Sequence, residues 1–213
     1  MKNNFIIKIC GTRSIPSAII VIKQKPSMIG LIFVPKKTRS VDIETAKKIS
    51  KLAHEEKILV VGVFQDQPIG QVLDTIRSVQ LDYVQLHGNE ASSYCKNIPV
   101  LIIKRIALKT NIEDTKMQMG QYLGLVDIFL IDRPKQGQGL IASIEQIRKL
   151  AQDYPIIIAG GLNQNNVEYV IEKGSKKLLG VDVSSGVESI LGEKDEKLVK
   201  SFINLARRSY EQY

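Results

Sequence analysis

Short apolar runs alternate with longer segments of helical periodicity along the whole 213-residue chain. Each run is rich in Val, Ile and Leu and stops at glycine or polar turn-forming residues, as buried strands of a parallel sheet do. The intervening segments repeat their apolar residues three or four positions apart, as at Ile43, Ala46 and Ile49, which is typical of an amphipathic helix. The predicted strands are Phe5–Cys10, Met28–Val34, Ile58–Phe64, Asp82–Leu86, Pro99–Arg105, Asp127–Ile131 and the two runs that begin at Ile156 and Gly180.

These alternating segments make eight strand–helix pairs, which predicts a (β/α)8 barrel. Consecutive strands begin roughly 18 to 30 residues apart, close to the minimum for a parallel crossover, and no linker or low-complexity stretch interrupts the series. Eight such units close into a barrel, whereas fewer would leave an open sheet. We therefore expect an α/β fold, a (β/α)8 TIM barrel forming a single domain over residues 1–213. The last helix is expected at Glu193–Tyr210.

The composition, 44% hydrophobic and 24% charged, is that of an ordinary soluble globular chain. No apolar run reaches the roughly 18 residues that a membrane span needs. The net charge is +8, but the lysines are spread over many predicted helices, which favours solvated helix faces over a nucleic-acid site. Cys10 and Cys95 are far apart and make neither a disulfide framework nor a metal cluster. We expect a cytoplasmic protein, a monomer or homodimer, that binds neither nucleic acid nor membrane.

Two glycine-containing loops near the end of the chain indicate a phosphate site. Gly160 and Gly161 follow the seventh strand, and Ser184, Ser185 and Gly186 follow the eighth. Glycine lets a backbone approach an anion, and free N–H groups at the start of a helix favour negative charge. For one such loop a tight turn is an equal explanation, but the pair matches the phosphate site that (β/α)8 barrels form at these positions. We therefore expect a small phosphorylated molecule as ligand, drawn in partly by the positive net charge.

Polar residues also follow the other strands, at the end of the barrel where active sites of this fold lie. Alone, a cysteine in a buried strand is usually packing, and an aspartate before Arg-Pro is usually a turn cap. Together they place a thiol, a carboxylate and arginines around one rim, without a histidine or carboxylate set that would hold a metal. The predicted rim consists of Cys10, Arg39, Gln65, Gln85 to His87, Lys104, Arg105, Asp132, Gly160, Gly161 and Asp182 to Gly186.

Several of these segments give the chain a resemblance to a known family. They are Lys8-Ile9-Cys10-Gly11, Gly30-Leu31-Ile32-Phe33-Val34-Pro35 with Arg39, Val61-Gly62-Val63-Phe64, Val84-Gln85-Leu86-His87-Gly88, Ala159-Gly160-Gly161-Leu162 and Gly180-Val181-Asp182-Val183-Ser184-Ser185-Gly186-Val187-Glu188. In these segments the chain resembles the phosphoribosylanthranilate isomerases, barrel enzymes of tryptophan synthesis. Phosphate loops are shared by many sugar-phosphate barrels, whereas cysteine-glycine after the first strand combined with Gln-Leu-His-Gly after the fourth is much more specific.

The resemblance implies an Amadori rearrangement without a cofactor, in which N-(5-phosphoribosyl)anthranilate becomes its 1-deoxyribulose 5-phosphate isomer. An acid must protonate the furanose ring oxygen so that the ring opens, and a base must then remove the proton from C2′. By the match to the family, Cys10 is the base and Asp132 the acid. Cations near the barrel mouth would let the Cys10 thiolate form at neutral pH. Partial burial or a neighbouring anion would keep a proton on Asp132.

The resemblance also implies residues that bind the substrate. Arg39 is expected to grip the anthranilate carboxylate, because its planar fork matches a carboxylate with two hydrogen bonds. Asp182 is expected near the sugar. Gln85 and His87 are expected to line the substrate site, with no acid–base role for His87.

The segment after the sixth strand departs from the family pattern. The family usually has a Gly-Gly-Thr/Ser-Gly segment there, whereas residues 135–139 read Lys-Gln-Gly-Gln-Gly. Gly137 and Gly139 remain candidates for phosphate binding, and Gln136 stands where a glycine is usual. Arg133, next to the proposed acid, is also unusual. We expect its guanidinium to point toward the phosphate or solvent, because contact with Asp132 would favour the carboxylate.

Two other functions remain open from the sequence. The first is that of a related sugar-phosphate barrel, such as the aminoaldose isomerase of histidine synthesis or an enzyme that acts on both substrates. Those barrels resemble this one but have an aspartate at the position of Cys10, which argues against this function. The second is a non-catalytic phosphate-binding barrel, suggested by the altered segment after the sixth strand.

Overall fold

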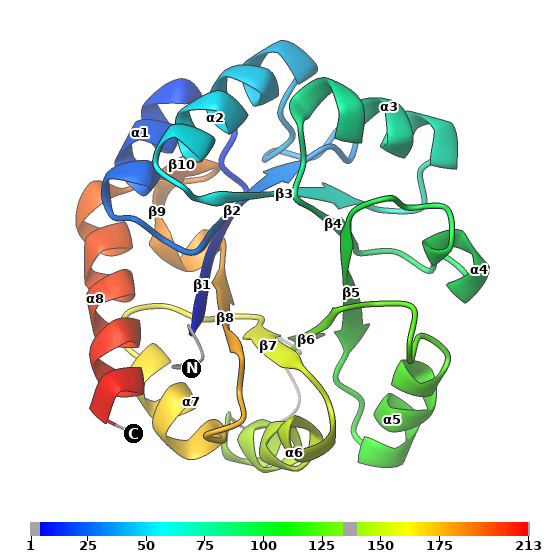
Figure 1. The fold of residues 1–213 in the computed structure, drawn as a ribbon. Coiled ribbons are helices and arrows are strands. Elements are labelled where there is room, and N and C mark those ends of the chain that lie inside the picture. Colours follow the sequence, from blue (N-terminus) through cyan, green and yellow to red (C-terminus); the bar gives the residue numbers. More distant parts are fainter. Residues whose placement is uncertain (1–4, 134–139, 213) are drawn as a thin grey trace.

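A closed ring of eight parallel strands forms the centre of the molecule, and helices surround it (Figure 1). The computed structural model describes residues 5–133 and 140–212. Strand order follows chain order, and the last strand pairs with the first, with Lys8 opposite Asp182. This confirms the predicted (β/α)8 barrel. The strands are β1 (Ile6–Cys10), β2 (Met28–Ile32), β3 (Leu59–Phe64), β4 (Tyr83–Leu86), β5 (Leu101–Ala107), β6 (Ile128–Asp132), β7 (Ile156–Ala159) and β8 (Gly180–Val183).

The helices begin at residues with capping side chains in several places. The side chain of Ser14 accepts a hydrogen bond from the Ser17 N–H, and that of Asp42 accepts one from the Thr45 N–H, so each satisfies a free N–H group of a first helical turn. The helices are α1 (Ile15–Lys23), α2 (Ile43–Glu55), α3 (Ile69–Val79), α4 (Ser92–Cys95), α5 (Ile112–Gly120), α6 (Leu140–Asp153), α7 (Val167–Gly174) and α8 (Glu196–Gln212).

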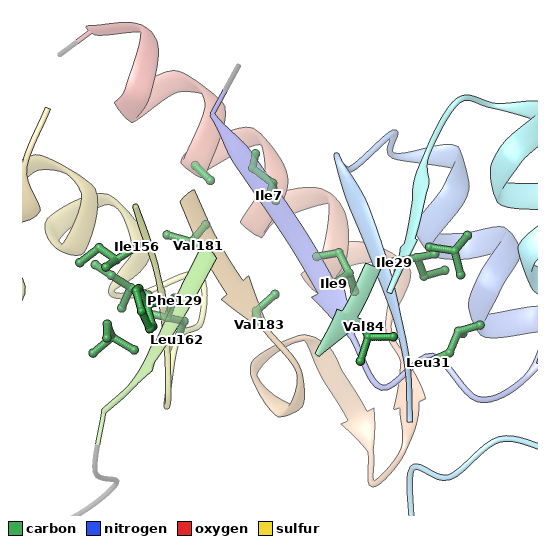
Figure 2. Packing of buried hydrophobic residues seen from close by; sticks show 14 of the residues in the cluster. Ile7, Ile9, Ile29, Leu31, Val84, Phe129, Ile156, Leu162, Val181 and Val183 are labelled. Atoms are coloured by element: carbon green, nitrogen blue, oxygen red, sulfur yellow. The ribbon is translucent and has the colours of Figure 1, made fainter. Parts of the chain in front are cut away.

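The core has two layers, because side chains alternate between the two faces of each strand. The outer layer lies between strands and helices; Figure 2 shows Ile7 and Ile9 of β1 beside Val181 and Val183 of β8 in this layer. Burying each such side chain stabilises the fold by about 1.5 to 3 kcal/mol. A smaller apolar cluster fills the barrel interior: Met28, Val61, Ile103, Ile128, Leu130, Ile157 and Ala159. The residues on the inward face beyond this cluster reach the barrel mouth.

The structure differs from the prediction between the eighth strand and the last helix. Residues predicted to begin the helix at Glu193 instead form the second strand of a small hairpin, β9 (Glu188–Ile190) and β10 (Glu193–Lys194), and α8 begins at Glu196. A short 3₁₀ turn, η1 (Ser185–Val187), precedes the hairpin. The hairpin brings Glu188 and Lys194 to the mouth of the barrel, where both take part in the site.

Candidate active site

A cavity of about 560 Å³ opens at the end of the barrel where the strands finish. Most of the residues predicted for this rim line it together, although they come from segments throughout the chain. Lys104 does not belong to the rim as predicted: its ammonium lies on the outer face of β5, where it binds Glu90 and the Gly88 carbonyl. The predicted residues that line the cavity are Cys10, Arg39, Gln65, Gln85, His87, Asp132, Gly160, Gly161, Asp182, Ser184 and Ser185.

Cys10 ends β1 with its side chain on the inward face, and only 5% of the residue is exposed. The neighbouring position on β2 is Gly30, where a Cβ atom would lie 2.8 Å from the Cys10 Sγ. The glycine therefore makes the room that the sulfur occupies. Burial raises the pKa of the Cys10 thiol above its ordinary value, and the charges of Lys8 and Lys194 offset only part of this rise. Burial therefore opposes a thiolate at Cys10, and the two lysines favour it.

Lys8 and Asp182 form a buried ion pair beside Cys10, which the sequence did not predict. The Lys8 Nζ lies 2.8 Å from the Asp182 Oδ1, and the lysine side chain is wholly buried. Burial alone would lower the pKa of Lys8, but Asp182 and then Cys10 raise it above its ordinary value. Asp182 lines the cavity as expected, and one of its carboxylate oxygens is already engaged by this lysine.

Arg39 is held by a carboxylate of the protein itself. Its Nε and Nη2 each donate a hydrogen bond of 2.7 Å to Glu188. Lys194 binds the same carboxylate at 2.9 Å and the Ser184 carbonyl at 3.0 Å. Although burial opposes it, these hydrogen bonds and that of the Gly192 N–H lower the pKa of Glu188 to about 2. The cluster fixes Arg39 at the cavity wall with its Nη1 outside this bidentate pair.

Asp132 ends β6 on the other side of the cavity and is bound by Arg105 of β5. The Arg105 Nε and Nη2 donate to the same oxygen, Asp132 Oδ2, at 3.1 and 2.9 Å. About a quarter of the Asp132 side chain is exposed, and about a third of that of Arg105. The sequence placed Arg105 on the rim but did not pair it with the proposed acid.

Arg133 lies next to Asp132 in the chain but turns elsewhere. Its Nη2 donates to the Gly160 carbonyl at 2.8 Å, and the residue is 8% exposed, so the guanidinium points away from solvent and toward one of the two predicted phosphate loops. Burial lowers the pKa of its guanidinium. Within residues 5–133 and 140–212, no hydrogen bond or ion pair joins it to Asp132. Arg133 therefore makes no contact within these ranges that counts against Asp132 as the acid. The cation that does bind Asp132 is Arg105.

Gln85 of β4 and His87, the first residue after that strand, both line the cavity. The Gln85 Nε2 and the His87 Nδ1 lie 3.1 Å apart. Burial lowers the pKa of His87, and the charge of Arg105 lowers it further. The Gln85 Oε1 is buried and has no hydrogen-bond partner among the described residues. It is an acceptor available to a hydroxyl group in the cavity.

The two predicted phosphate loops border the cavity. Gly160 has a φ of +88°, and a Cβ there would lie 2.4 Å from the Arg133 carbonyl oxygen, so only glycine fits this turn. Gly161, Ser184 and Ser185 line the cavity. Gly186, which lies in η1, packs against the Leu162 carbonyl instead. The predicted phosphate contacts Gly137 and Gly139 lie outside the described residues.

Two further properties concern the described ranges only. In residues 5–133 and 140–212, no group of three histidine, cysteine, aspartate or glutamate side chains is arranged to hold a metal ion. Over the same ranges no helix combines the length and the apolar character needed to cross a membrane. The cavity brings a thiol and a carboxylate beside the two loops that the sequence predicts to bind phosphate, an arrangement suited to proton transfer on a bound molecule.

Comparison with known proteins decides the family. The profile of the family described as N-(5′-phosphoribosyl)anthranilate (PRA) isomerase matches residues 7–205. This chain belongs to that family. The N-(5′-phosphoribosyl)anthranilate isomerase of Oceanobacillus iheyensis is 36% identical over 203 residues, covering 95% of this chain and 97% of the relative.

Solved structures of the phosphoribosylanthranilate isomerase family share the fold. The enzyme from Thermotoga maritima superposes with a TM-score of 0.85 and 30% identity, over 96% of this chain and 99% of that one. A second structure, a phosphoribosylanthranilate isomerase in complex with reduced 1-(o-carboxyphenylamino)-1-deoxyribulose 5-phosphate, matches with a TM-score of 0.83, 30% identity and the same coverage. The bound molecule in that relative is phosphorylated and carries a carboxyphenyl group.

Charged residues that the sequence did not assign complete the site of this isomerase-family member. Lys8 could have been found, because it lies two positions before Cys10 on a strand and therefore on the same face. Glu188 ends the segment that carried the family resemblance, but nothing in the sequence named its partner. Lys194 could not be found, since the hairpin that positions it was predicted as helix.

Proposed function

We propose that this chain converts N-(5-phosphoribosyl)anthranilate into 1-(2-carboxyphenylamino)-1-deoxyribulose 5-phosphate, with Cys10 as general base and Asp132 as general acid. One observation carries the proposal: Cys10 and Asp132 line the same cavity as the loops of Gly160, Gly161, Ser184 and Ser185. A molecule with its phosphate at those loops has its sugar between a thiol and a carboxylate.

The reaction follows from these positions. Asp132 gives a proton to the furanose ring oxygen, the bond from C1′ to that oxygen breaks, and the anthranilate nitrogen and C1′ form a Schiff base. The Cys10 thiolate then takes the proton from C2′, which leaves an enolamine and a thiol. The enolamine tautomerises to the ketone. Asp132 ends ionised and Cys10 protonated, and proton exchange with solvent resets both groups between turnovers.

Arg105 holds the acid in place. It donates two hydrogen bonds to Asp132 Oδ2, so the carboxyl group has a fixed position at the cavity. About a quarter of the Asp132 side chain is exposed, so protons can reach it from solvent.

Cations on the loop after β2 are suited to the anthranilate carboxylate. Arg39 has its Nη1 outside the pair with Glu188, and Lys37 lines the same cavity two residues before it. Asp182 and the free Gln85 Oε1 are suited to the sugar hydroxyls. The remaining phosphate contacts, Gly137 and Gly139, stay predictions from the sequence, as do the oligomeric state and the cytoplasmic location.

Turnover by the purified chain tests this function. Fluorescence should fall as phosphoribosylanthranilate is consumed, and a Cys95→Ser variant should match the unaltered chain, because Cys95 is buried outside the cavity. The histidine-pathway aminoaldose substrate is assayed in parallel. Tight binding of phosphate without turnover of either substrate would contradict the proposal in favour of a non-catalytic barrel, and turnover of the second substrate alone would reassign the reaction.

A further inference from the structure

A lysine in the middle of a barrel strand points into the barrel instead of toward water. Lys8 lies on β1 between two apolar outward residues, Ile7 and Ile9, and its side chain has no exposed surface. Its strand neighbour on β8 is Asp182, and the two side chains meet at 2.8 Å. A buried ammonium costs free energy unless it is paired and hydrogen-bonded, so a lysine in this buried position needs charged or polar partners.

The ammonium also acts on a neighbouring sulfur. Cys10 is two residues further along β1 and therefore on the same face of the strand, where the charge of the Lys8 ammonium favours its thiolate. Lys8 thus joins the two cavity-lining residues Cys10 and Asp182 from below the cavity floor. It is absent from the cavity lining itself, so it acts on the substrate only through them.

Taking the site residues above in their proposed roles, we propose that Lys8 is a positioning residue of the reaction, whose ammonium holds the Cys10 sulfur as a thiolate facing the substrate. The proposal rests on the proposed function, because it concerns the base of that reaction. When Cys10 takes the C2′ proton, the sulfur becomes a neutral thiol and the ammonium keeps its pairing with Asp182. Lys8 gains or loses no proton in the step.

The balance of charge around the sulfur supports this role. The charged groups that face Cys10 in the described part of the chain are Lys8 of β1, Asp182 of β8, Lys194 of β10 and Arg39 of the loop after β2. Glu188 pairs with the last two. This cluster therefore holds three cations and two carboxylates, and a thiolate at Cys10 makes it neutral.

A second buried lysine shows what a purely structural pair looks like in the same barrel. Lys104 of β5 has no exposed side-chain surface and binds Glu90 at 2.6 Å, but it lies on the outer face of its strand under Tyr122. It lies near Cys95, which is outside the cavity, and not near Cys10. Lys104 is therefore a matched control for residue type, burial and pairing, without the link to the proposed base.

Alkylation of Cys10 as a function of pH tests the proposal without any turnover. The parent is the Cys95→Ser variant, in which Cys10 is the remaining thiol, and the probe is iodoacetamide, which reacts with the thiolate. Lys8→Met should slow alkylation at a fixed pH by about tenfold and move its midpoint up by about one pH unit. Asp182→Asn should move the midpoint down, because Asp182 opposes the thiolate while Lys8 supports it. Lys104→Met should leave the midpoint unchanged.

Opposite shifts in Lys8→Met and Asp182→Asn support the proposal. An unchanged midpoint in Lys8→Met, an equal shift in Lys104→Met, or an upward shift in Asp182→Asn overturns it. Should Lys8→Met fail to fold, as judged by circular dichroism, the Asp182→Asn result alone decides, since that change keeps the shape and a hydrogen-bond acceptor.

The pH profile of kcat/KM separates this inference from the proposed function. Lys8→Met should shift the acid limb of the profile upward by the same amount as the alkylation midpoint, while KM changes little. If the Cys95→Ser parent turns over phosphoribosylanthranilate and Cys10→Ser does not, the function holds whatever Lys8 does. In that case an unshifted acid limb overturns only the positioning role of Lys8. An active Cys10→Ser variant instead refutes Cys10 as the base, and the role of Lys8 falls with it.

Discussion

The two sides of the barrel mouth hold their functional groups in different ways. Around Cys10, charged side chains from β1, β8, the loop after β2 and the β9–β10 hairpin bind one another in a mostly buried cluster, and the sulfur lies against Gly30. Around Asp132, on β5 and β6, one arginine binds the carboxylate, and both side chains are partly exposed.

The difference follows from what each group must do. A thiolate has to be stabilised where it is desolvated by substrate, so fixed cations serve it better than water. An acid that is recharged in every turnover needs a path to solvent, which the exposure of Asp132 provides. Changes to the buried ion pairs around Cys10 should therefore affect folding and activity together, and changes on the Asp132 side should affect activity alone.

The largest effect is expected from the base. Cys10→Ser should lower kcat by about a thousandfold, because a serine hydroxyl is a far weaker base at neutral pH and general base catalysis contributes about 10²- to 10⁴-fold. The urea midpoint should change little, since the side chains are of similar size. Steady-state kinetics of this variant beside Cys95→Ser makes the measurement, and a near-normal kcat would rule out Cys10 as the base.

The acid should show a similar loss of activity with no loss of stability. Asp132→Asn should lower kcat by about a hundredfold, because the amide cannot give a proton to the ring oxygen. The carboxylate it replaces is partly exposed and paired only with Arg105, so the free energy of unfolding should change by less than about 1 kcal/mol. If Asp132→Asn is fully active, or if it fails to fold, the two sides of the barrel mouth do not differ as described.

Glu188 provides the matched change on the buried side. Glu188→Gln leaves Arg39 and Lys194 without their carboxylate and should destabilise the fold by about 3 kcal/mol, measured by urea unfolding at pH 7. KM should rise as well, because Arg39 loses its fixed position. If this variant is as stable as Asp132→Asn, the two sides do not differ as described.

The same variant has a signed pH dependence. The pKa of Glu188 is lowered from 4.5 to about 2 in the fold, so its stabilising effect is fully present above about pH 5 and is lost as pH falls toward 2. The difference in stability between the unaltered chain and Glu188→Gln should therefore shrink from pH 5 to pH 3. A difference that stays constant over this range would show that the carboxylate charge is not its source.

The smallest effect is expected at Arg105. Arg105→Met removes the two donors that hold Asp132 Oδ2, so the acid is less well positioned and kcat should fall by about threefold to tenfold in steady-state kinetics. Arg77→Met, at an exposed pair with Asp74, is the control and should leave kcat unchanged. An unchanged kcat in Arg105→Met would show that Arg105 does not position the acid.

The sequence predicted the barrel and most of the rim because both depend on local regularities. Strand alternation, glycine turns and the segments from Cys10 to Glu188 brought Cys10, Asp132, Arg39 and Asp182 to one cavity. The ion pairs Lys8–Asp182 and Arg39–Glu188 could not be predicted from the sequence, because each joins residues far apart in the chain. Nor could the position of Lys194, since two residues of hairpin before a helix carry no pattern of their own.

The bare backbone at Gly30 has a consequence for the base beside it. It leaves the side chain at position 10 bounded on one face by main chain alone, and the surrounding cluster carries one uncompensated positive charge. A short carboxylate at this position would meet both the room and the charge it needs. Exchange of the thiol for an aspartate would therefore keep a base in the same place, so the choice of substrate is made by the walls of the cavity and not by its base.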